Sequence, residues 1–310
     1  MNNIEHDLSP VSWDMFTRLH VHNSLCTVLD AMLTTERNPR RGDDEPLNMV
    51  FEGSSGAGKS SALDIFCSRL DSLFPHTRDS QPYLRVTILG PANVGWLTAL
   101  ALEGLGEGVI SSKGNIGSRT KRIINGIRER NVRILLFDEV NEFTDKGSAY
   151  VDQTLVSWTK TIVDSSPVGT VLCGLSGCRR IIDTDIQMKR RFPTTLQLDA
   201  LRWDWASKSS KYREYMQWVV DYLQIPGADL FLEQHIAARF RLATMGLVGL
   251  GAPMLKLLRT HHLEGRLERL TLETLHAALD NDIHILVSDQ KPFSTALSDK
   301  RAIDAAASAV

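Results

Sequence analysis

A glycine-rich octapeptide early in the chain has the residue types needed to hold a polyphosphate. Gly53 to Ser60 reads GSSGAGKS and matches the pattern G-x-x-x-x-G-K-[ST] at every fixed position. Glycines let backbone N–H groups converge on phosphate oxygens, Lys59 can reach the β and γ phosphates, and the Ser60 hydroxyl can hold Mg²⁺. The sequence therefore predicts an ATP-binding loop with nine contacting residues, namely Gly53, Ser54, Ser55, Gly56, Ala57, Gly58, Lys59, Ser60 and Ser61.

The residues on both sides of this loop have the pattern of a strand and a helix. The apolar run Leu47–Phe51 suits a buried strand, and the residues from Ser60 onward place Leu63, Phe66 and Leu70 on one helical face. A helix that begins at the loop adds the positive end of its dipole to the phosphate site. This strand–turn–helix context distinguishes a phosphate loop from a glycine turn before an ordinary helix.

Two adjacent carboxylates follow a second apolar run. Arg133–Phe137 predicts a buried strand, which ends at Asp138 and Glu139. Asp138 can reach Mg²⁺ directly or through water, and Glu139 can polarise a water molecule for in-line attack on the γ-phosphate. The pair favours hydrolysis over transfer to a small hydroxyl group. We therefore take Glu139, Asp138 and Lys59 as candidate catalytic residues, and Ser60 and Asp138 as candidate metal ligands.

Strands alternate with helices through the first two thirds of the chain. Further strands are predicted at Tyr83–Leu89, Thr170–Gly174 and Thr195–Leu198. This alternation predicts an α/β fold with a doubly wound parallel sheet. After Asp199 the pattern is purely helical. We expect helices there at Asp204–Leu223, Asp229–Ala243, Gly246–His261 and Leu272–Leu279.

The same patterns predict a division into four segments. We expect an N-terminal helical segment and loop over 1–46, an α/β phosphate-loop core over 47–200, a helical lid over 201–280 and a C-terminal tail over 281–310. The tail is weakly patterned from Val287 onward, which predicts a loosely packed terminus around Phe293.

Composition narrows the class of protein further. The chain has 310 residues, of which 43% are hydrophobic and 23% charged, as is typical of soluble globular proteins. Its net charge of -2 argues against coating nucleic acid by bulk charge, although a local basic patch remains compatible with it. The four cysteines form no C-x-x-C pair, which favours free thiols in a reducing compartment. No signal segment or transmembrane run is visible, so we expect a cytoplasmic protein without a membrane partner.

The order of the motifs resembles that of the AAA+ ATPases. Asp138 and Glu139 are followed by Gly174-Leu175-Ser176 after another predicted strand, and then by Gln187–Phe192 (QMKRRF). In that class the polar residue after the fourth strand is a sensor of the nucleotide, and Ser176 matches it. The arginine before the phenylalanine resembles the finger that reaches a neighbouring subunit's nucleotide. Arg191 is the first choice for this role and Arg190 the second.

Three stretches and the size of the chain resemble a narrower group, the transposon ATPase regulators called TniB and TnsC. These stretches are FEGSSGAGKS, ILLFDEVNEF and VLCGLSGCRRIIDTDIQMKRRF, and the resemblance covers about residues 25–279. MuB and IstB are more distantly similar. The resemblance implies an AAA+ core with a small all-helical lid that uses ATP and Mg²⁺. It also implies homo-oligomers, as rings or filaments on duplex DNA, which link a target-site selector to a transposase.

An assembly on DNA needs a surface that contacts backbone phosphates. Basic residues that flank a Gly/Ser-rich loop, enter the helix before Asp138 or follow Glu139 are the candidates. They are Lys113, Arg119, Lys121, Arg122 and Lys146. No base-reading motif is present, which predicts binding that is largely independent of sequence and sensitive to salt.

Two other functions are compatible with the same motifs. One is a structural scaffold that binds ATP and forms a filament on DNA, with hydrolysis dispensable. The other is an AAA+ ATPase outside transposition, similar to a replication initiator or a clamp loader. ATP turnover with and without duplex DNA separates the scaffold from the enzyme.

Overall fold

The chain folds into two compact units. The computed structural model describes residues 27, 30–35, 47–77, 79–90, 93–107, 114–143, 153–166, 168–281 and 291–308. Within these, an α/β unit is formed by residues up to 55 and by 59–198, and a helical unit by 56–58 and the residues from 199 onward. Of the predicted N-terminal segment 1–46, the described residues 27 and 30–35 are helical.

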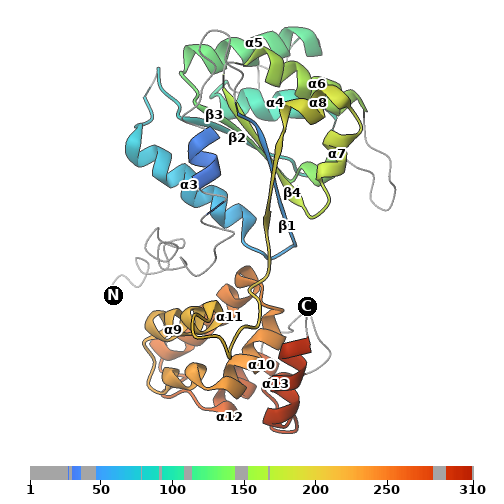
Figure 1. The fold of residues 1–310 in the computed structure, drawn as a ribbon. Coiled ribbons are helices and arrows are strands. Elements are labelled where there is room, and N and C mark those ends of the chain that lie inside the picture. The colour runs from blue at the N-terminus through green and yellow to red at the C-terminus, as the bar shows by residue number, and fades with distance from the viewer. Residues whose placement is uncertain are drawn as a thin grey trace, which may run out of the picture. The chain divides into compact units, whose positions relative to one another are not determined.

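A five-stranded sheet lies at the centre of the α/β unit (Figure 1). Its strand order is β2-β3-β4-β1-β5, and all neighbouring strands are parallel. The strands are β1 Met49–Gly53, β2 Tyr83–Thr87, β3 Ile134–Asp138, β4 Gly169–Leu175 and β5 Thr194–Leu198. The predicted α/β class with a parallel sheet is confirmed. Because parallel strands end at one edge, the residues that follow β1, β3 and β4 share that edge.

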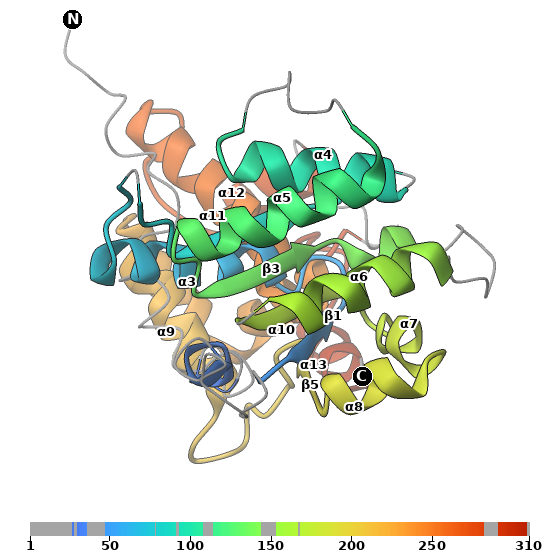
Figure 2. The same cartoon turned by 90° about the horizontal axis from the view of Figure 1, so that it is seen from above.

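Helices cover both faces of this sheet. They are α3 Lys59–Leu73, α4 Val94–Gly104, α5 Ile116–Glu129, α6 Gln153–Ser165, α7 Arg179–Asp183 and α8 Ile186–Arg191. Helices α4, α5 and α6 lie over one face and α3 over the other (Figures 1 and 2). Leu135 and Phe137 of β3 join the hydrophobic core under α4–α6, whereas the alternate residues Ile134 and Leu136 are buried on the opposite face.

The regular elements of the second unit are all helical in its described residues, as predicted. Its elements are α9 Lys211–Leu223, η4 Ala228–Leu232, α10 Gln234–Thr244, α11 Val248–Leu263, α12 Leu272–Leu275, η5 His276–Asn281 and α13 Asp299–Ser308. Aromatic rings fill its interior. Tyr215 stacks on Trp218 at 5.9 Å between centroids, and Phe231 meets Phe240 edge-on at 5.4 Å.

Two helix boundaries differ from the prediction. Helix α9 begins at Lys211 rather than at Asp204, because the Asp204 carboxylate accepts the backbone N–H groups of Lys211 (2.7 Å) and Tyr212 (3.1 Å) and so caps the helix from a preceding loop. The expected helix Asp229–Ala243 is interrupted at Glu233, whose backbone is extended (φ -79°, ψ 131°).

The expectation of a loosely packed tail is wrong. Phe293 is fully buried, and the buried Arg239 donates hydrogen bonds to the carbonyl oxygens of Pro292 (2.8 Å) and Ser294 (3.0 Å). Helix α13 buries only the small residues Ala302 and Ala306. Alanine carries little apolar surface, so a buried face made of alanines offers no large apolar residues for the sequence pattern to detect.

No single helix among the described residues has the length and apolar content to cross a bilayer. Helices α10 and α11 pass that test only when they are joined across a 113° bend.

Candidate nucleotide-binding site

The glycine loop connects β1 directly to α3. Gly56 and Gly58 have φ values of 77° and 101°, a region that L side chains rarely adopt, so glycine is required at both positions. Ser54, Ser55 and Ser60 are exposed, and α3 begins at Lys59. The loop therefore presents backbone N–H groups and a helix N-terminus together, which is the arrangement that binds phosphate.

Lys59 is held inside the loop. Its side-chain Nζ donates hydrogen bonds to the carbonyl oxygens of Gly53 (2.9 Å) and Ser54 (3.0 Å), and the residue is only 7% exposed. The ammonium group thus bonds to neutral carbonyls. A charged phosphate oxygen forms a stronger hydrogen bond with an ammonium group and can displace them.

Asp138 ends β3 at the same edge of the sheet and is buried. Its Oδ1 atom accepts the Glu139 backbone N–H at 3.0 Å, and its Oδ2 atom accepts a hydrogen bond from Arg85 of β2 at 2.7 Å. Arg85 also pairs with Asp64 of α3. Burial by itself lowers the pKa of Arg85, but the hydrogen bonds to Asp138 and Asp64 outweigh burial and raise that pKa overall.

Arg85 is a site residue that sequence reasoning missed. It occupies the middle of β2, whose register pairs it with Leu136 of β3. The available signal was a charged residue inside an alternating, β-branched run beside the strand that carries Asp138. Because a guanidinium group so placed needs an anionic partner, the nearest strand-end carboxylate was the residue to examine.

Glu139 has an unusual backbone conformation. Its φ is 61°, in the left-handed region, and it is followed by the short turn η3 Val140–Phe143. A non-glycine residue in this region is strained by about 1–3 kcal/mol, and such strain is concentrated at functional sites. The Glu139 carboxylate has no hydrogen bond or ion pair with any residue that the structure describes.

The turn after β4 contacts the start of the phosphate loop. The Ser176 backbone N–H donates to the Gly53 carbonyl oxygen at 3.2 Å, and Ser176 is exposed. The structure thus brings the predicted sensor residue next to the predicted loop, through the backbone.

The two candidate arginines at the end of α8 differ in their surroundings. Arg191 forms a two-pronged ion pair with Asp164 of α6, with Nη2 to Oδ2 at 2.9 Å, and also donates to the Gln187 carbonyl oxygen at 2.9 Å. Arg190 is exposed and pairs with no residue in the described part of the chain. In the chain as folded, Arg190 is the arginine available to another molecule.

A family model with the description "Bacterial TniB protein" matches residues 14–201 of this chain. The chain belongs to the bacterial TniB family. None of the curated proteins matches it.

Solved structures of AAA+ proteins are similar to this TniB family chain. The Cdc6p structure from Pyrobaculum aerophilum is 13% identical with a TM-score of 0.57, and the match covers 84% of this chain and 66% of that chain. The Aeropyrum pernix ORC2 protein is 13% identical (TM-score 0.52; 90% and 70%), and domain III of DnaA from Thermotoga maritima is 17% identical (TM-score 0.54; 89% and 100%). This TniB chain therefore has the AAA+ fold, as predicted, and spans about two thirds of the length of the two archaeal chains.

The residues of the TniB chain fit a nucleotide with Mg²⁺. Ser60 and Asp138 offer oxygen ligands, which this hard cation prefers. Among the described residues no group of three or more His, Cys, Asp or Glu could hold a metal by itself. A magnesium ion here would therefore take its other ligands from phosphate groups and water, as is usual for this ion in nucleotide sites.

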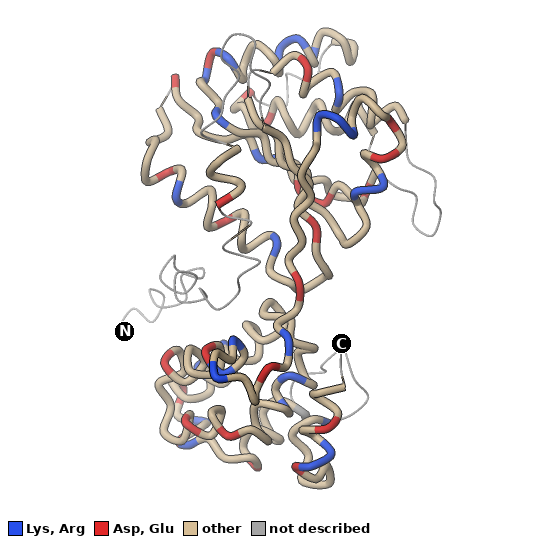
Figure 3. The backbone as a smooth tube through the Cα atoms, in the orientation of Figure 1, with Lys and Arg blue, Asp and Glu red and all other residues tan. Residues whose placement is uncertain are grey.

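The predicted DNA contacts of the TniB chain divide into three groups. Lys113 and Lys146 lie outside the described residues. Arg119 donates to the Gly95 carbonyl oxygen at 3.3 Å and Arg122 pairs with Glu107, so both guanidinium groups are bound within the α/β unit. Lys121 is exposed on α5, the helix along which basic positions recur (Figure 3).

Proposed function

We propose that this TniB family protein is an ATP-hydrolysing AAA+ protein of DNA transposition. It assembles on duplex DNA and links target-site selection to the transposase. One observation carries the proposal: Lys59 in its phosphate loop and the pair Asp138 and Glu139 lie at the same edge of the sheet in a chain of this family. The cytoplasm, where ATP and DNA are both present, is its proposed location.

In the proposed mechanism the loop from Gly53 to Ser61 binds the phosphates of ATP. Lys59 exchanges two loop carbonyls for β and γ phosphate oxygens, and Ser60 and Asp138 hold Mg²⁺. The ion neutralises charge on the phosphates when it is bound. Glu139 accepts a proton from the attacking water while the water oxygen bonds to the γ-phosphorus and the bond from that phosphorus to the β,γ-bridging oxygen breaks, which releases ADP. The strained backbone of Glu139, and the absence of a partner for its carboxylate among the described residues, support this role.

The site is completed by a neighbouring subunit in this proposal. An arginine at the end of α8 stabilises charge on the neighbour's γ-phosphate, and Ser176 senses the nucleotide of its own subunit. The resemblance favours Arg191 for the arginine, whereas the ion pair of Arg191 with Asp164 leaves Arg190 as the exposed candidate. Homo-oligomers, as rings or filaments, are then required for full activity.

The assembly is proposed to contact DNA through backbone phosphates. The Aeropyrum pernix ORC1 protein, which has the same fold, was solved in complex with DNA at 15% identity and a TM-score of 0.51. Lys121, Arg119, Arg122, Lys113 and Lys146 are the proposed contacts. With no base-reading motif, affinity should fall steeply as salt rises and vary little with DNA sequence.

Turnover of ATP by two variants tests the proposal. Lys59→Ala should abolish ATP binding and assembly on DNA. Glu139→Gln should still bind ATP but hydrolyse it at least about 100-fold more slowly, since it removes the general base. Normal hydrolysis by Glu139→Gln would overturn the assignment of the base. ATP-dependent assembly without any hydrolysis in the unaltered protein would favour the scaffold function instead.

A further inference from the structure

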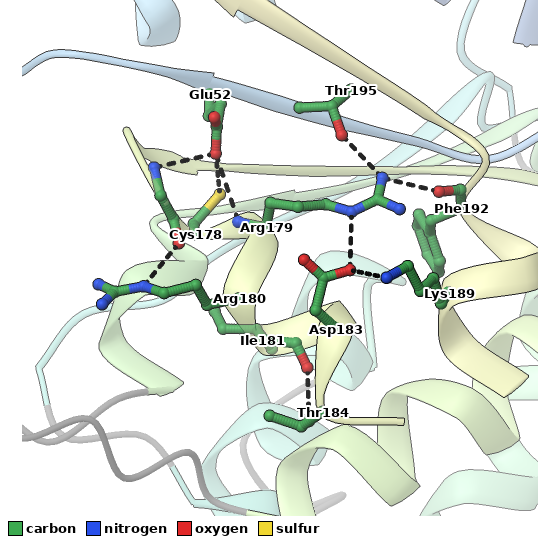
Figure 4. Close-up of polar contacts among 11 residues, drawn as sticks. Glu52, Cys178, Arg179, Arg180, Ile181, Asp183, Thr184, Lys189, Phe192 and Thr195 are labelled. Carbon is green, nitrogen blue, oxygen red and sulfur yellow. Dashed lines mark hydrogen bonds and ion pairs between the residues drawn. The ribbon is translucent and has the colours of Figure 1, made fainter. Parts of the chain in front are cut away.

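Two residues at the end of β1 hold the turn that follows β4, and Figure 4 shows the contacts of the first of them, Glu52. The Glu52 carboxylate accepts the backbone N–H groups of Gly177 (3.0 Å) and Arg179 (3.3 Å) through its Oε2 atom. The next residue, Gly53, accepts the Ser176 N–H through its carbonyl oxygen at 3.2 Å. The turn before α7 is therefore attached to the residues that lead directly into the phosphate loop.

The side chain of Arg179 extends from this turn to the far end of α8 (Figure 4). Its Nη1 atom donates to the carbonyl oxygen of Phe192 at 2.8 Å and to the Thr195 hydroxyl of β5 at 2.7 Å, while Nε lies 3.4 Å from Asp183 Oδ1. Phe192 directly follows Arg191. A planar guanidinium group with several donors fixes the relative orientation of the elements it joins.

A second contact attaches the same end of α8 to β1. The buried Asn48, next to the first residue of β1, donates to the Arg191 carbonyl oxygen at 3.1 Å and accepts the Thr170 N–H of β4 at 2.9 Å. The carbonyl groups of both Arg191 and Phe192 are thus held by partners linked to β1. The last turn of α8, where Arg190 and Arg191 lie, is therefore connected to that strand by hydrogen bonds.

The phosphate loop also contributes to this path of hydrogen bonds. The Gly53 carbonyl oxygen accepts both the Ser176 N–H and the Lys59 ammonium group. When phosphate binds and the Lys59 ammonium group moves to it, the Gly53 carbonyl oxygen loses the hydrogen bond from Lys59 and keeps the one from the Ser176 N–H. The contacts from Lys59 through Glu52 and Gly53 to Arg179 form a continuous physical connection, as coupling between two sites requires.

Resting on the function proposed above, we infer that Arg179 is a positioning residue. It couples the phosphate loop of a subunit to the last turn of α8 in the same subunit. It thereby sets the aim of the Arg190 and Arg191 side chains toward the neighbour's nucleotide. In an assembly, the position of the Arg190 and Arg191 side chains of each subunit then depends on the nucleotide bound to that same subunit.

The chain supplies a matched control for Arg179 in the next residue. Arg180 lies on the same short helix and is exposed, and its Nε atom donates to the Gly177 carbonyl oxygen at 3.2 Å. It contacts neither Phe192 nor β5 in the described structure. Arg180→Ala therefore removes an equal charge from α7 without removing the connection to α8.

The test mixes two kinds of full-length chain. The donor carries Glu139→Gln, so that it binds ATP, keeps α8 and does not hydrolyse. The recipient carries Arg190→Ala with Arg191→Ala, so that it keeps its own nucleotide site but supplies no arginine. ATP turnover by the mixture then measures how well Arg190 and Arg191 of the donor act on the nucleotide sites of the recipient.

The inference predicts an asymmetry in this mixture. Arg179→Ala in the donor should lower turnover at least about tenfold, because small displacements of catalytic groups are costly. Arg179→Ala in the recipient should lower turnover far less, because α8 of the recipient carries neither Arg190 nor Arg191. Arg180→Ala in the donor should change it less than twofold, by roughly the scatter expected of exposed positions. Equal losses from Arg179→Ala in donor and recipient, or no loss in the donor, would overturn the inference.

A second measurement separates this inference from the proposed function. Hydrogen exchange of the α8 amides in the single chain, with and without a non-hydrolysable ATP analogue, needs no assembly. The analogue should change α8 exchange in the unaltered chain and in Arg180→Ala, but not in Arg179→Ala or Glu52→Gln. The same change in all four chains would refute the coupling. A mixture of donor and recipient that is no more active than the two apart would refute the shared site instead.

Folding of the variants is checked by their thermal unfolding midpoints. If Arg179→Ala does not fold, Arg179→Lys replaces it, since lysine keeps the charge and loses the planar group that joins Phe192 and Thr195 to Asp183. The same donor–recipient asymmetry is expected for this variant, and its absence would count against the inference.

Discussion

Two arginines organise the two units of this protein in different ways. In the helical unit, the side chain of Arg239 is 1% exposed and donates to the carbonyl oxygens of Pro292 and Ser294 and to the carboxylate of Asp299. In the α/β unit, the side chain of Arg179 is 21% exposed and joins α7 to the end of α8 and to β5.

The two arginines differ in where their hydrogen-bond partners lie in the chain. The partners of Arg239 belong to one continuous segment, and without the arginine its buried carbonyl groups would lose their hydrogen bonds. That contact fixes the C-terminal segment in place. The partners of Arg179 belong to separate elements, namely Asp183 of α7, Phe192 at the end of α8 and Thr195 of β5, and of these Phe192 is buried and Thr195 exposed. A partly exposed connection between separate elements can shift with the nucleotide, whereas a fully buried one serves stability.

The largest predicted effect concerns the two adjacent arginines at the end of α8, of which Arg190 is exposed and Arg191 is paired with Asp164. Arg190→Ala should lower ATP turnover of the assembled protein about 1000-fold, the lower range for an arginine at a transferring phosphoryl group. Arg191→Ala should have a smaller effect on turnover and cost less than about 1 kcal/mol of stability, since its ion pair with Asp164 is half-exposed. Steady-state turnover and urea unfolding of both variants give the comparison. The reverse order of the two rates would assign the role to Arg191.

The next effect tests the fixed contact in the helical unit. Arg239→Ala should lower the free energy of unfolding by about 3 kcal/mol, because buried carbonyl groups lose their donors. ATP affinity should change little, since the hydrogen bonds of Arg239 go to residues between Pro292 and Asp299 and not to the phosphate loop. Arg301→Ala, an exposed change on α13, should cost less than about 0.5 kcal/mol and serves as the control. Equal unfolding curves for the two variants would refute the proposal that Arg239 fixes the C-terminal segment in place.

The smallest effect concerns the cap of α9. Burial acts to raise the pKa of Asp204, but N–H donors from Lys211 and Tyr212 and the Ser210 hydroxyl outweigh it, and the pKa is lowered. A carboxyl with a lowered pKa in the folded state contributes stability above its unfolded pKa, which is about 3.9, and loses it as pH falls through the folded value.

Asp204→Asn should therefore cost about 1 kcal/mol at pH 7 and progressively less below about pH 4. Urea unfolding of the variant and the unaltered protein at both pH values measures this difference. A cost that does not depend on pH would show that the charge of Asp204 is not what stabilises the helix.

Local patterns were enough to predict the sheet and the loop. Buried apolar runs mark β1, β3 and β4 because strands covered on both faces must be apolar along their length. The glycine positions of the phosphate loop are set by backbone geometry, which is a local property. The roles assigned to Lys59, Asp138 and Glu139 remain predictions that the variants above can test.

Contacts between distant residues could not be predicted in the same way. Arg85 with Asp138, and Glu52 with the turn after β4, join residues far apart in the sequence. Their pairing depends on the strand order, which places β1 beside β4 and β2 beside β3. The order of the tail could not be predicted for a related reason, because it depends on contacts with residues far away in the sequence, such as Arg239.

Electron microscopy of the Glu139→Gln protein with ATP and duplex DNA tests the central claim most directly. The account predicts rings or helices of the protein threaded by DNA, which form with ATP and are absent with Lys59→Ala. Single, unassembled chains in the presence of ATP and duplex DNA would contradict it.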